Sequence, residues 1–324
     1  MTFPHHDSSV IRIGTRGSAL AIAQATETRD RLIAAHGLTP ADFEIVIIRT
    51  TGDRIQDRSL KDIGGKGLFT REIEDALLDG GIDLAVHSMK DMPVLQPDGL
   101  VIDCYLPRQD PRDAFLSVKY RSLEDLPAGA VVGSSSLRRR AQVSYRRPDL
   151  QLVEFRGNVQ TRLRKLDEGV ADATFLAMAG LARLDLIDLA RSAIPAEVML
   201  PAIAQGAIGV ERRRDDTRMA DMLAAICDRP TLLRVEAERA FLARLDGSCE
   251  TPIAGLAELD GDTLWLRGEI LLPDGTVAVA GERKGFAVDG AMMGADLADE
   301  LLSRAPKDFC DLTGINPLRR SPPV

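Results

Sequence analysis

The sequence predicts an α/β protein with two α/β lobes and a small α+β domain at its C-terminal end. Over the first two thirds of the chain, short apolar runs typical of strands alternate with segments of helical periodicity, the pattern of parallel sheets covered by helices. From about residue 250 the pattern changes to alternating apolar and polar residues, interrupted by the hairpin signals Asp260-Gly261 and Asp274-Gly275. A chain of 324 residues is also long enough for more than one core, because single cores stop growing at roughly 250–300 residues.

The first lobe begins with a strand, a short polar turn and a helix. Residues 10–14 predict the strand, residues 19–35 predict the helix, and Ser18 lies at the position of a good N-cap. Free N–H groups at a helix N-terminus bind anions, and Arg16 adds a guanidinium group to the same turn. We therefore expect an anion site at the start of this helix.

A polar segment at 51–67 separates a strand expected over 43–50 from a helix expected over 68–80. It is rich in glycine near its end, where Gly64 and Gly65 are adjacent. Glycine hinges in a polar segment are typical of an active-site lid, but they are equally typical of a long solvated connection. Composition leaves both interpretations open.

The stretch IDLAVHSMKDMP, at residues 82–93, is the strongest indication of a functional site. Its apolar beginning fits a buried strand, and the polar residues His87, Ser88, Lys90 and Asp91 follow. In α/β sheets, ligands bind just beyond the carboxyl ends of strands, so Lys90 and Asp91 lie where chemistry is expected. The alternative interpretation is a strand cap with a surface ion pair.

A strand over 100–107 ends the first lobe, and the second lobe repeats the order of strand, polar turn and helix. A strand over 131–133 leads through a turn of serines into a helix whose first turn holds three arginines, Arg138, Arg139 and Arg140. Positive charge in that turn opposes the helix dipole, which favours a bound anion over a solvated face.

The next strand and helix, expected over 150–157 and 158–169, again carry arginines near the strand end and the helix start, namely Arg156 and Arg162. An apolar strand over 207–211 follows, and we expect it to cross back to the first lobe. Two crossings between two lobes would form a cleft lined by the basic residues of both.

The last part of the chain predicts helices over 216–226, 231–245 and 291–305, with the hairpins between the second and the third. The predicted domains are a first α/β domain of residues 1–106 and 202–224, a second α/β domain of residues 107–201, and an α+β domain of residues 225–324.

The four cysteines are widely scattered, so their spacing indicates neither a zinc site nor a disulfide framework. Cys104 falls in a predicted strand and Cys227 in an apolar helix, where both are expected to be packing residues. Cys249 differs, because it lies in a turn-forming stretch where a thiol should be accessible. It could be a nucleophile, a covalent attachment point or a chance exposure. A Cys–His hydrolase needs an imidazole, and only His87 lies near the candidate site, so attachment is at least as plausible as hydrolysis.

Composition excludes several classes of protein. A net charge of −8 and an aromatic content of 4% argue against a general nucleic-acid binder and against a base-stacking surface. The chain contains no apolar run of about 18 residues, so we expect no membrane span. Its first residues, MTFPHHDSSV, show no secretory signal, and we therefore expect a cytoplasmic protein.

Eight ordered stretches together resemble the porphobilinogen deaminase (hydroxymethylbilane synthase) family, and the resemblance extends from about residue 10 to residue 305. They are residues 14–25, 64–78, 83–93, 110–115, 133–142, 156–169, 200–211 and 247–254. The resemblance implies two lobes like those of periplasmic binding proteins, with a double crossover, and a third domain that carries a cysteine loop.

The same resemblance implies an activity. Enzymes of this family are transferases of porphyrin and heme biosynthesis that join four porphobilinogen molecules head to tail with loss of ammonia. The chain grows on a covalently bound dipyrromethane, and water then releases the linear tetrapyrrole. We expect a monomer whose small-molecule partner is porphobilinogen, without a metal and without a nucleic-acid or membrane partner.

Individual residues match the functional positions of the family. Asp91 matches the catalytic aspartate, and Cys249 matches the cysteine that holds the dipyrromethane through a thioether. The matches to cofactor-binding positions are Lys90, Asp91, Ser136, Arg138, Arg139 and Arg162. The matches to substrate-binding positions are Arg16, Ser18, Lys66, Phe69, Arg156 and Gln205.

The chain departs from the family pattern in a few places. Ser248 and Ala254 replace glycines on either side of the cysteine, and these changes between small residues do not threaten attachment. Asp62 stands where many relatives have a lysine, which puts one contact of the lid segment in doubt. Two alternatives also remain: a two-lobed binding module for an anionic small molecule without catalysis, and an arginine-rich nucleic-acid protein, which the net charge disfavours.

Overall fold

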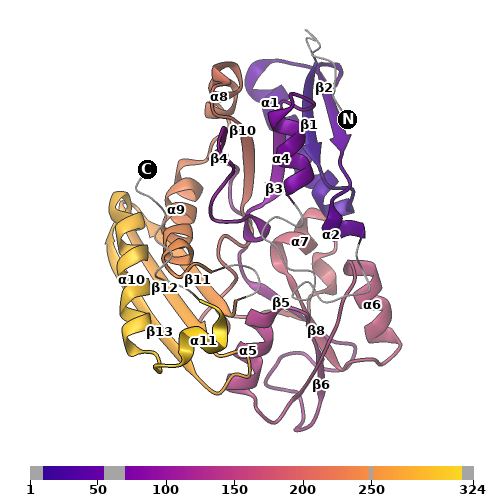
Figure 1. Ribbon diagram of the computed structural model, residues 1–324. Helices are drawn as coiled ribbons and strands as arrows, with labels where there is room; N and C mark the ends of the chain where they lie inside the picture. The colour runs from indigo at the N-terminus through magenta and orange to yellow at the C-terminus, as the bar shows by residue number, and fades with distance from the viewer. Residues whose placement is uncertain (1–9, 55–69, 248–250, 316–324) are drawn as a thin grey trace. The chain divides into compact units, whose positions relative to one another are not determined.

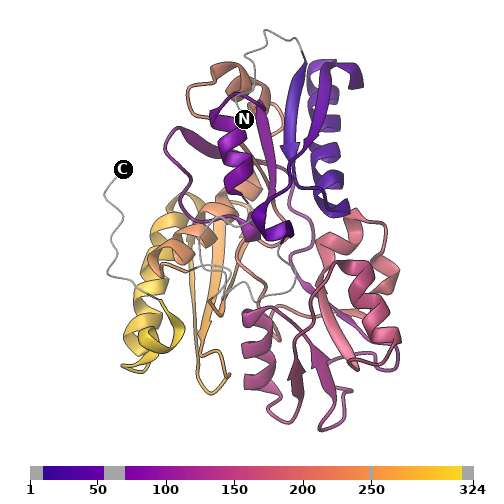
Figure 2. The same ribbon diagram turned by 45° about the vertical axis from the view of Figure 1, so that its right-hand side comes forward.

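The computed structural model describes residues 10–54, 70–247 and 251–315 (Figure 1). The chain divides into two compact units. Unit 1 consists of Met1–Gln109 and Ala207–Leu232, and unit 2 consists of Asp110–Gly206 and Leu233–Val324. Three sheets are visible as separate bodies of strands (Figure 2). The α/β class expected from the sequence is confirmed.

Unit 1 is built on one five-stranded sheet with the order β2-β1-β3-β10-β4. Its strands are β1 (Ile11–Thr15), β2 (Phe43–Ile47), β3 (Leu84–Ser88), β4 (Leu100–Tyr105) and β10 (Ile208–Arg213). Strand β1 is parallel to β2 and β3, whereas β10 is antiparallel to β3 and β4. Because β10 pairs with strands from the beginning of the chain, the expected crossing back to the first lobe is confirmed.

Helices α1 (Ala19–His36) and α8 (Thr217–Ala224) pack on this sheet through one apolar cluster, and α4 (Arg71–Leu78) packs on it through a second cluster. The short helix α2 (Thr51–Arg54) follows β2. Helix α1 begins where the sequence predicts, because the Ser18 hydroxyl accepts the Ala21 N–H at 3.2 Å. Leu32 of α1 is completely buried beside Ile13, Leu84 and Ile208 of the sheet, so helix and sheet share one core.

The first sheet of unit 2 has the order β7-β6-β8-β5-β9 and repeats the strand directions of unit 1. Its strands are β5 (Asp113–Leu116), β6 (Val131–Gly133), β7 (Gln151–Val153), β8 (Ala173–Ala177) and β9 (Ser192–Ala193). Strand β6 is parallel to β7 and β8, and β5 is antiparallel to β8 and β9. Helices α5 (Leu137–Arg146), α6 (Val159–Asp167) and α7 (Met178–Arg183) follow the carboxyl ends of β6, β7 and β8.

A second, antiparallel sheet in unit 2 contains β11 (Ile253–Asp260), β12 (Thr263–Leu271) and β13 (Ala278–Phe286). Both predicted hairpin turns connect its strands. Helix α10 (Gly290–Arg304) lies along this sheet (Figures 1 and 2), and α9 (Arg229–Arg244) packs against α10. The two helices approach closely at Gly294, where a Cβ atom would overlap the carbonyl oxygen of Ala237. A short helix, α11 (Phe309–Thr313), ends the described chain and was not expected from the sequence.

Several expected boundaries are wrong. Strand β3 includes His87 and Ser88, because pairing with β10 extends it by two residues beyond its apolar run. The polar segment after β2 begins with the single turn α2 instead of an open loop, and the rest of the predicted lid lies outside the described residues. Cys227 lies between α8 and α9, because the Asp228 carboxylate accepts the Thr231 N–H at 2.9 Å and starts a new helix.

The predicted division into three domains stays a prediction. Unit 2 joins the expected second lobe with the expected C-terminal domain, although their strands form two separate sheets. Across the described ranges, the helices are too short or too polar to cross a membrane.

Candidate active site

A small pocket lies at the carboxyl ends of β1 and β3 in unit 1. Its volume is about 70 Å³, and Arg16, Ser18, Gln24 and Asp91 are among the residues that line it. The neighbouring strands β1 and β3 are parallel, so the turns that follow them meet at the same edge of the sheet. The pocket therefore combines a guanidinium group, a helix N-terminus and a carboxylate.

Hydrogen bonds tie the two sides of this pocket together. Gln24 of α1 donates from Nε2 to the Ser88 hydroxyl at 2.8 Å, and that hydroxyl lies 3.1 Å from Gln24 Oε1. Lys90 and Asp91 follow in the 3-10 turn η2 (Met89–Asp91), whose first N–H donates to the Ala207 carbonyl at 3.1 Å. Asp91 itself is exposed, so its carboxylate can reach a ligand in the pocket.

A buried ionisable group underlies the pocket. His87 Nε2 lies 2.9 Å from Glu211 Oε2, and both side chains are almost completely inaccessible to solvent. Glu74 is buried nearby, and burial together with the charge of Glu211 raises its pKa. His87 thus has a carboxylate partner within unit 1, which accounts for its burial without a role for Cys249.

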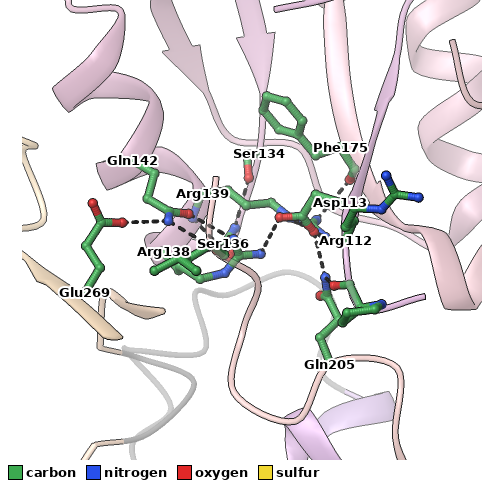
Figure 3. A network of polar contacts seen from close by, with 12 residues as sticks. Arg112, Asp113, Ser134, Ser136, Arg138, Arg139, Gln142, Phe175, Gln205 and Glu269 are labelled. Carbon is green, nitrogen blue, oxygen red and sulfur yellow. Dashed lines mark hydrogen bonds and ion pairs between the residues drawn. The ribbon is translucent and has the colours of Figure 1, made fainter. Parts of the chain in front are cut away.

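Unit 2 contains a second polar centre, in which two arginines of α5 share one carboxylate (Figure 3). Arg138 Nη2 lies 2.8 Å from Asp113 Oδ2, and Arg139 Nη2 lies 2.7 Å from Asp113 Oδ1. Gln205 Nε2 donates to the same Oδ1 at 2.9 Å. Burial raises the pKa of Asp113, but the charges of Arg138 and Arg139 outweigh this effect and hold the pKa well below its usual value.

The three arginines at the start of α5 led us to expect a negative charge nearby. Asp113 supplies part of it. Two guanidinium groups against one carboxylate still leave one positive charge in the buried centre. Nε of Arg138 is a buried donor without a hydrogen-bond partner among the described residues. The centre therefore retains both charge and donor capacity for a further anion.

Arg162 of α6 adds to this excess of positive charge. Burial and the nearby charge of Arg139 lower the pKa of Arg162 to about 10, against a weak opposing effect of Glu154. Its guanidinium donates from Nε to the Gly157 carbonyl at 2.9 Å. Arg162 is half-buried, and a carboxylate bound beside it would offset the repulsion from Arg139. We call Arg138, Arg139 and Arg162, together with Asp113, the arginine cluster.

The remaining predicted residues of unit 2 surround this cluster. Ser136 caps α5, with its hydroxyl accepting the Arg139 N–H at 3.4 Å. Arg156 follows β7, and its Nε lies 3.3 Å from a carboxylate oxygen of the exposed Glu154. Gln205 is buried and precedes the crossing to β10. Helices α5 and α6 begin at the carboxyl ends of the parallel strands β6 and β7, so these residues gather at one edge of the sheet.

The structure thus groups the predicted residues into two sets. Arg16, Ser18 and Asp91 line the pocket of unit 1, with Lys90 beside Asp91 in η2. Ser136, Arg138, Arg139, Arg162 and Gln205 belong to or adjoin the arginine cluster of unit 2. Lys66, Phe69 and Cys249 lie outside the described residues.

Sequence reasoning missed Asp113, the residue that organises the cluster. The available signal was an aspartate at the start of the otherwise apolar strand DAFL, where a charge is costly unless it is paired. It also missed Gln24, whose polar side chain lies on the buried face of α1. Over the part of the chain that the structure describes, no group of three or more His, Cys, Asp or Glu side chains is arranged to hold a metal ion.

The donor sets in both units suit ligands that carry several carboxylates, and comparisons with known proteins agree with this chemistry. Residues 11–221 match the family model of the porphobilinogen deaminase dipyromethane cofactor binding domain, and residues 232–303 match that of the porphobilinogen deaminase C-terminal domain.

Curated relatives match over nearly the whole chain. The porphobilinogen deaminase of Paracoccus denitrificans is 72% identical over 301 residues, which cover 93% of this chain and 96% of the relative. That of Nitrobacter hamburgensis is 55% identical over 300 residues, with 93% and 95% coverage. Among solved structures, a nutrient-binding protein from Burkholderia cenocepacia aligns with a TM-score of 0.41 at 15% identity, over 69% of this chain and 93% of the other. That score is too low to add to the argument.

Proposed function

The chain belongs to the porphobilinogen deaminase family, and we propose that its pocket in unit 1 and its arginine cluster in unit 2 are the parts that carry out the reaction of that family. The protein has hydroxymethylbilane synthase activity: it is a transferase that joins four porphobilinogen molecules head to tail with loss of ammonia, primed on a dipyrromethane. The assignment of roles to individual residues is the proposal.

The arginine cluster is the proposed binding site for the carboxylates of the dipyrromethane. When bound, the dipyrromethane supplies the pyrrole carbon to which the first substrate is joined. Arg138, Arg139 and Arg162 neutralise its acetate and propionate groups, with a hydrogen bond from Ser136. Lys90 and Asp91 are assigned to cofactor binding by their match to the family alone. The lowered pKa of Arg162 and the unpartnered Nε of Arg138 support this role, because both call for an added anion. Cys249 is the proposed anchor, through a thioether.

Asp91 is the proposed catalytic residue. Loss of ammonia leaves an electron-poor carbon on the substrate, and attack by a pyrrole carbon on it places positive charge on pyrrole nitrogens. An exposed carboxylate in a pocket can accept hydrogen bonds from those N–H groups, stabilise the charge and take up the released proton. The observation that carries the assignment is that Asp91 lines the same small pocket as Arg16 and the N-terminus of α1.

The incoming porphobilinogen carries an acetate and a propionate, and Arg16 with Ser18 is the proposed site for one of them. A guanidinium group beside a helix N-terminus binds a carboxylate with both charge and hydrogen bonds. Lys66, Phe69, Arg156 and Gln205 are assigned to substrate binding by their match to the family alone. We also infer a monomer that acts in the cytoplasm and has no nucleic-acid partner. The net charge of −8 and the pairing of Arg138 and Arg139 with Asp113 support the last point.

The first test is the intact mass of the purified protein and of Cys249→Ser. We expect wild-type protein to exceed the mass of its chain by two linked pyrrole units and the serine variant to have the bare mass. A serine variant that keeps the added mass would disprove the anchor. The alternative of a binding module without catalysis predicts no covalent adduct at all, even after porphobilinogen is added.

The second test concerns Asp91. Asp91→Asn should keep the covalent dipyrromethane and the fold but lose about 100-fold or more of kcat, because positioned acid–base groups contribute roughly 10²–10⁴-fold. Asp98→Asn removes the same charge from an exposed position outside the pocket and is the matched control. Normal turnover by Asp91→Asn would rule out the assigned role, while the mass of the holoprotein would still test the anchor separately.

A further inference from the structure

Two cysteines that are far apart in the sequence are neighbours in unit 1. Cys104 lies in β4 at the edge of the sheet, and Cys227 lies in the connection between α8 and α9. The Cys227 thiol donates to the carbonyl oxygen of Asp103, the residue before Cys104, at 3.6 Å, so the two cysteine side chains lie close together. The Asp228 N–H donates to the Tyr105 carbonyl at 2.7 Å, so residues 227–228 run beside residues 104–105.

The two thiols have different surroundings. Cys104 is buried in the apolar core, with its Sγ 3.5 Å from the Leu223 carbonyl, and its hydrogen bond with Cys227 and its burial raise its pKa. Cys227 is only half-buried. The hydrogen bond from Cys104 lowers its pKa to about 6, against the effects of burial and of the charges of Asp103 and Asp228. Cys227 is therefore an accessible nucleophile, and Cys104 is a buried thiol next to it.

We propose that Cys104 and Cys227 are a redox modification site that reacts with hydroperoxides and closes to a disulfide. The Cys227 thiolate attacks one oxygen of the peroxide, the O–O bond breaks, and Cys227 becomes a sulfenic acid while hydroxide leaves. The sulfur of Cys104 then attacks the sulfur of the sulfenic acid. The S–S bond forms, the S–O bond breaks, and the departing hydroxide takes the Cys104 proton. Two thiols and one hydrogen peroxide give one disulfide and two waters.

The backbone brings the two cysteines near each other. The hydrogen bond from the Asp228 N–H to the Tyr105 carbonyl joins the two segments one residue beyond each cysteine. A disulfide then requires the Cα atoms to lie roughly 4.4–6.8 Å apart. The chain leaves unit 1 soon after each cysteine, at Gln109 and at Leu232, so the disulfide would fasten two exit segments of unit 1 to each other. This inference does not depend on the roles proposed for Asp91 or the arginine cluster.

The test uses the holoprotein treated with hydrogen peroxide at neutral pH. Intact mass should fall by two hydrogen atoms, and digestion without reductant should release one peptide pair that joins Cys104 to Cys227. Cys310→Ser is the matched control and should form the same disulfide, because Cys310 lies in α11 of unit 2. A wild-type protein that keeps all its free thiols, or a crosslink that includes Cys310, would overturn the proposal.

Single variants separate the two roles. Cys104→Ser and Cys104→Ala should stop at the sulfenic acid, which a dimedone probe traps on Cys227, whereas Cys227→Ser should form neither product. Alkylation of Cys227 should be half-maximal near pH 6 in the wild type and at a higher pH in Cys104→Ala, which has no side-chain donor to lower the pKa of Cys227. Identical alkylation profiles in wild type and in Cys104→Ala would contradict the pairing.

Discussion

Asp113 has the largest influence of any single residue on the candidate site. Its carboxylate binds Arg138, Arg139 and Gln205 together, and none of these side chains is appreciably exposed. Arg138 is also held by the Gln142 side chain and the Leu200 carbonyl, each at 2.9 Å. Because so many contacts fix the guanidinium groups, they are positioned before any ligand binds, which reduces the cost of binding.

Asp113→Asn should destabilise the protein strongly. The amide would leave two buried guanidinium groups without a counter-charge, and removing one partner of a buried pair costs about 3–5 kcal/mol. Urea unfolding at neutral pH measures the change. Asp149→Asn removes a carboxylate that pairs with Arg147 at the surface, and it should have a much smaller effect. Equal effects of the two variants would contradict the importance of the buried network.

The same network predicts a pH dependence. The pKa of Asp113 is lower in the folded state than the unfolded value of about 3.9. Its contribution to stability is therefore complete above that unfolded value and is lost as the pH falls below about 4, because protons then bind more strongly to the unfolded chain. The unfolding free energy of wild type should fall more steeply than that of Asp113→Asn in this acidic range, as urea titrations at several pH values would measure.

At the scale of the element, both candidate sites use the same device, a capped helix that starts at the carboxyl end of a parallel strand. Ser18, Ser136 and Asn158 each accept a backbone N–H in the first turn of α1, α5 and α6, at 3.2, 3.4 and 2.9 Å. A cap satisfies one of the free N–H groups and fixes the direction of the helix. The positive ends of these helices and the arginines beside them both favour a bound anion.

Helix α10 allows a prediction in which two effects have opposite signs. Alanine is a better helix former than glycine by roughly 0.5–1 kcal/mol, yet Gly294→Ala should destabilise the protein because the Cβ would meet the backbone of α9. Thermal unfolding measures the result. Met292→Ala, on a face of the same helix where Met292 is 67% exposed, should change stability little. An increase in stability for Gly294→Ala would show that α9 and α10 can separate at no cost.

At the scale of the whole molecule, two sheets share one pattern of strand directions. In each sheet, one strand lies antiparallel to its neighbours: β10, which returns from after the second lobe, in unit 1, and β5, the first strand of its segment, in unit 2. The chain therefore passes between the units after Gln109, Gly206 and Leu232 while each keeps its own core. Each unit therefore has its own sheet edge at which a ligand can bind.

Loss of the dipyrromethane should lower the stability of the whole protein. A group that binds only the native state stabilises that state, and here it would also neutralise the excess charge around Arg162. We expect a lower thermal midpoint for Cys249→Ser than for the wild-type holoprotein, whereas Cys310→Ser should keep the wild-type midpoint. Porphobilinogen should raise the midpoint of cofactor-free wild type but not that of Cys249→Ser. Equal midpoints of holoprotein and Cys249→Ser would argue against this linkage.

The sequence by itself determined most of the elements and the chemical character of the site. Periodicity and caps predicted α1 with Ser18, the arginine-bearing start of α5, and the hairpins at Asp260-Gly261 and Asp274-Gly275. These features depend on residues that are close in the chain, so local patterns record them. The ordered motifs also identified the family, which the comparisons confirmed.

Only the tertiary structure decided which distant residues became partners. Asp113 between two arginines, His87 against Glu211, and Cys104 beside Cys227 each join residues that no local pattern connects. The extension of β3 through Ser88 likewise followed from pairing with β10, because a strand ends where its partner ends. Burial and pairing of charge are properties of the folded arrangement, and they set the pKa values and the fixed geometry on which the proposed chemistry rests.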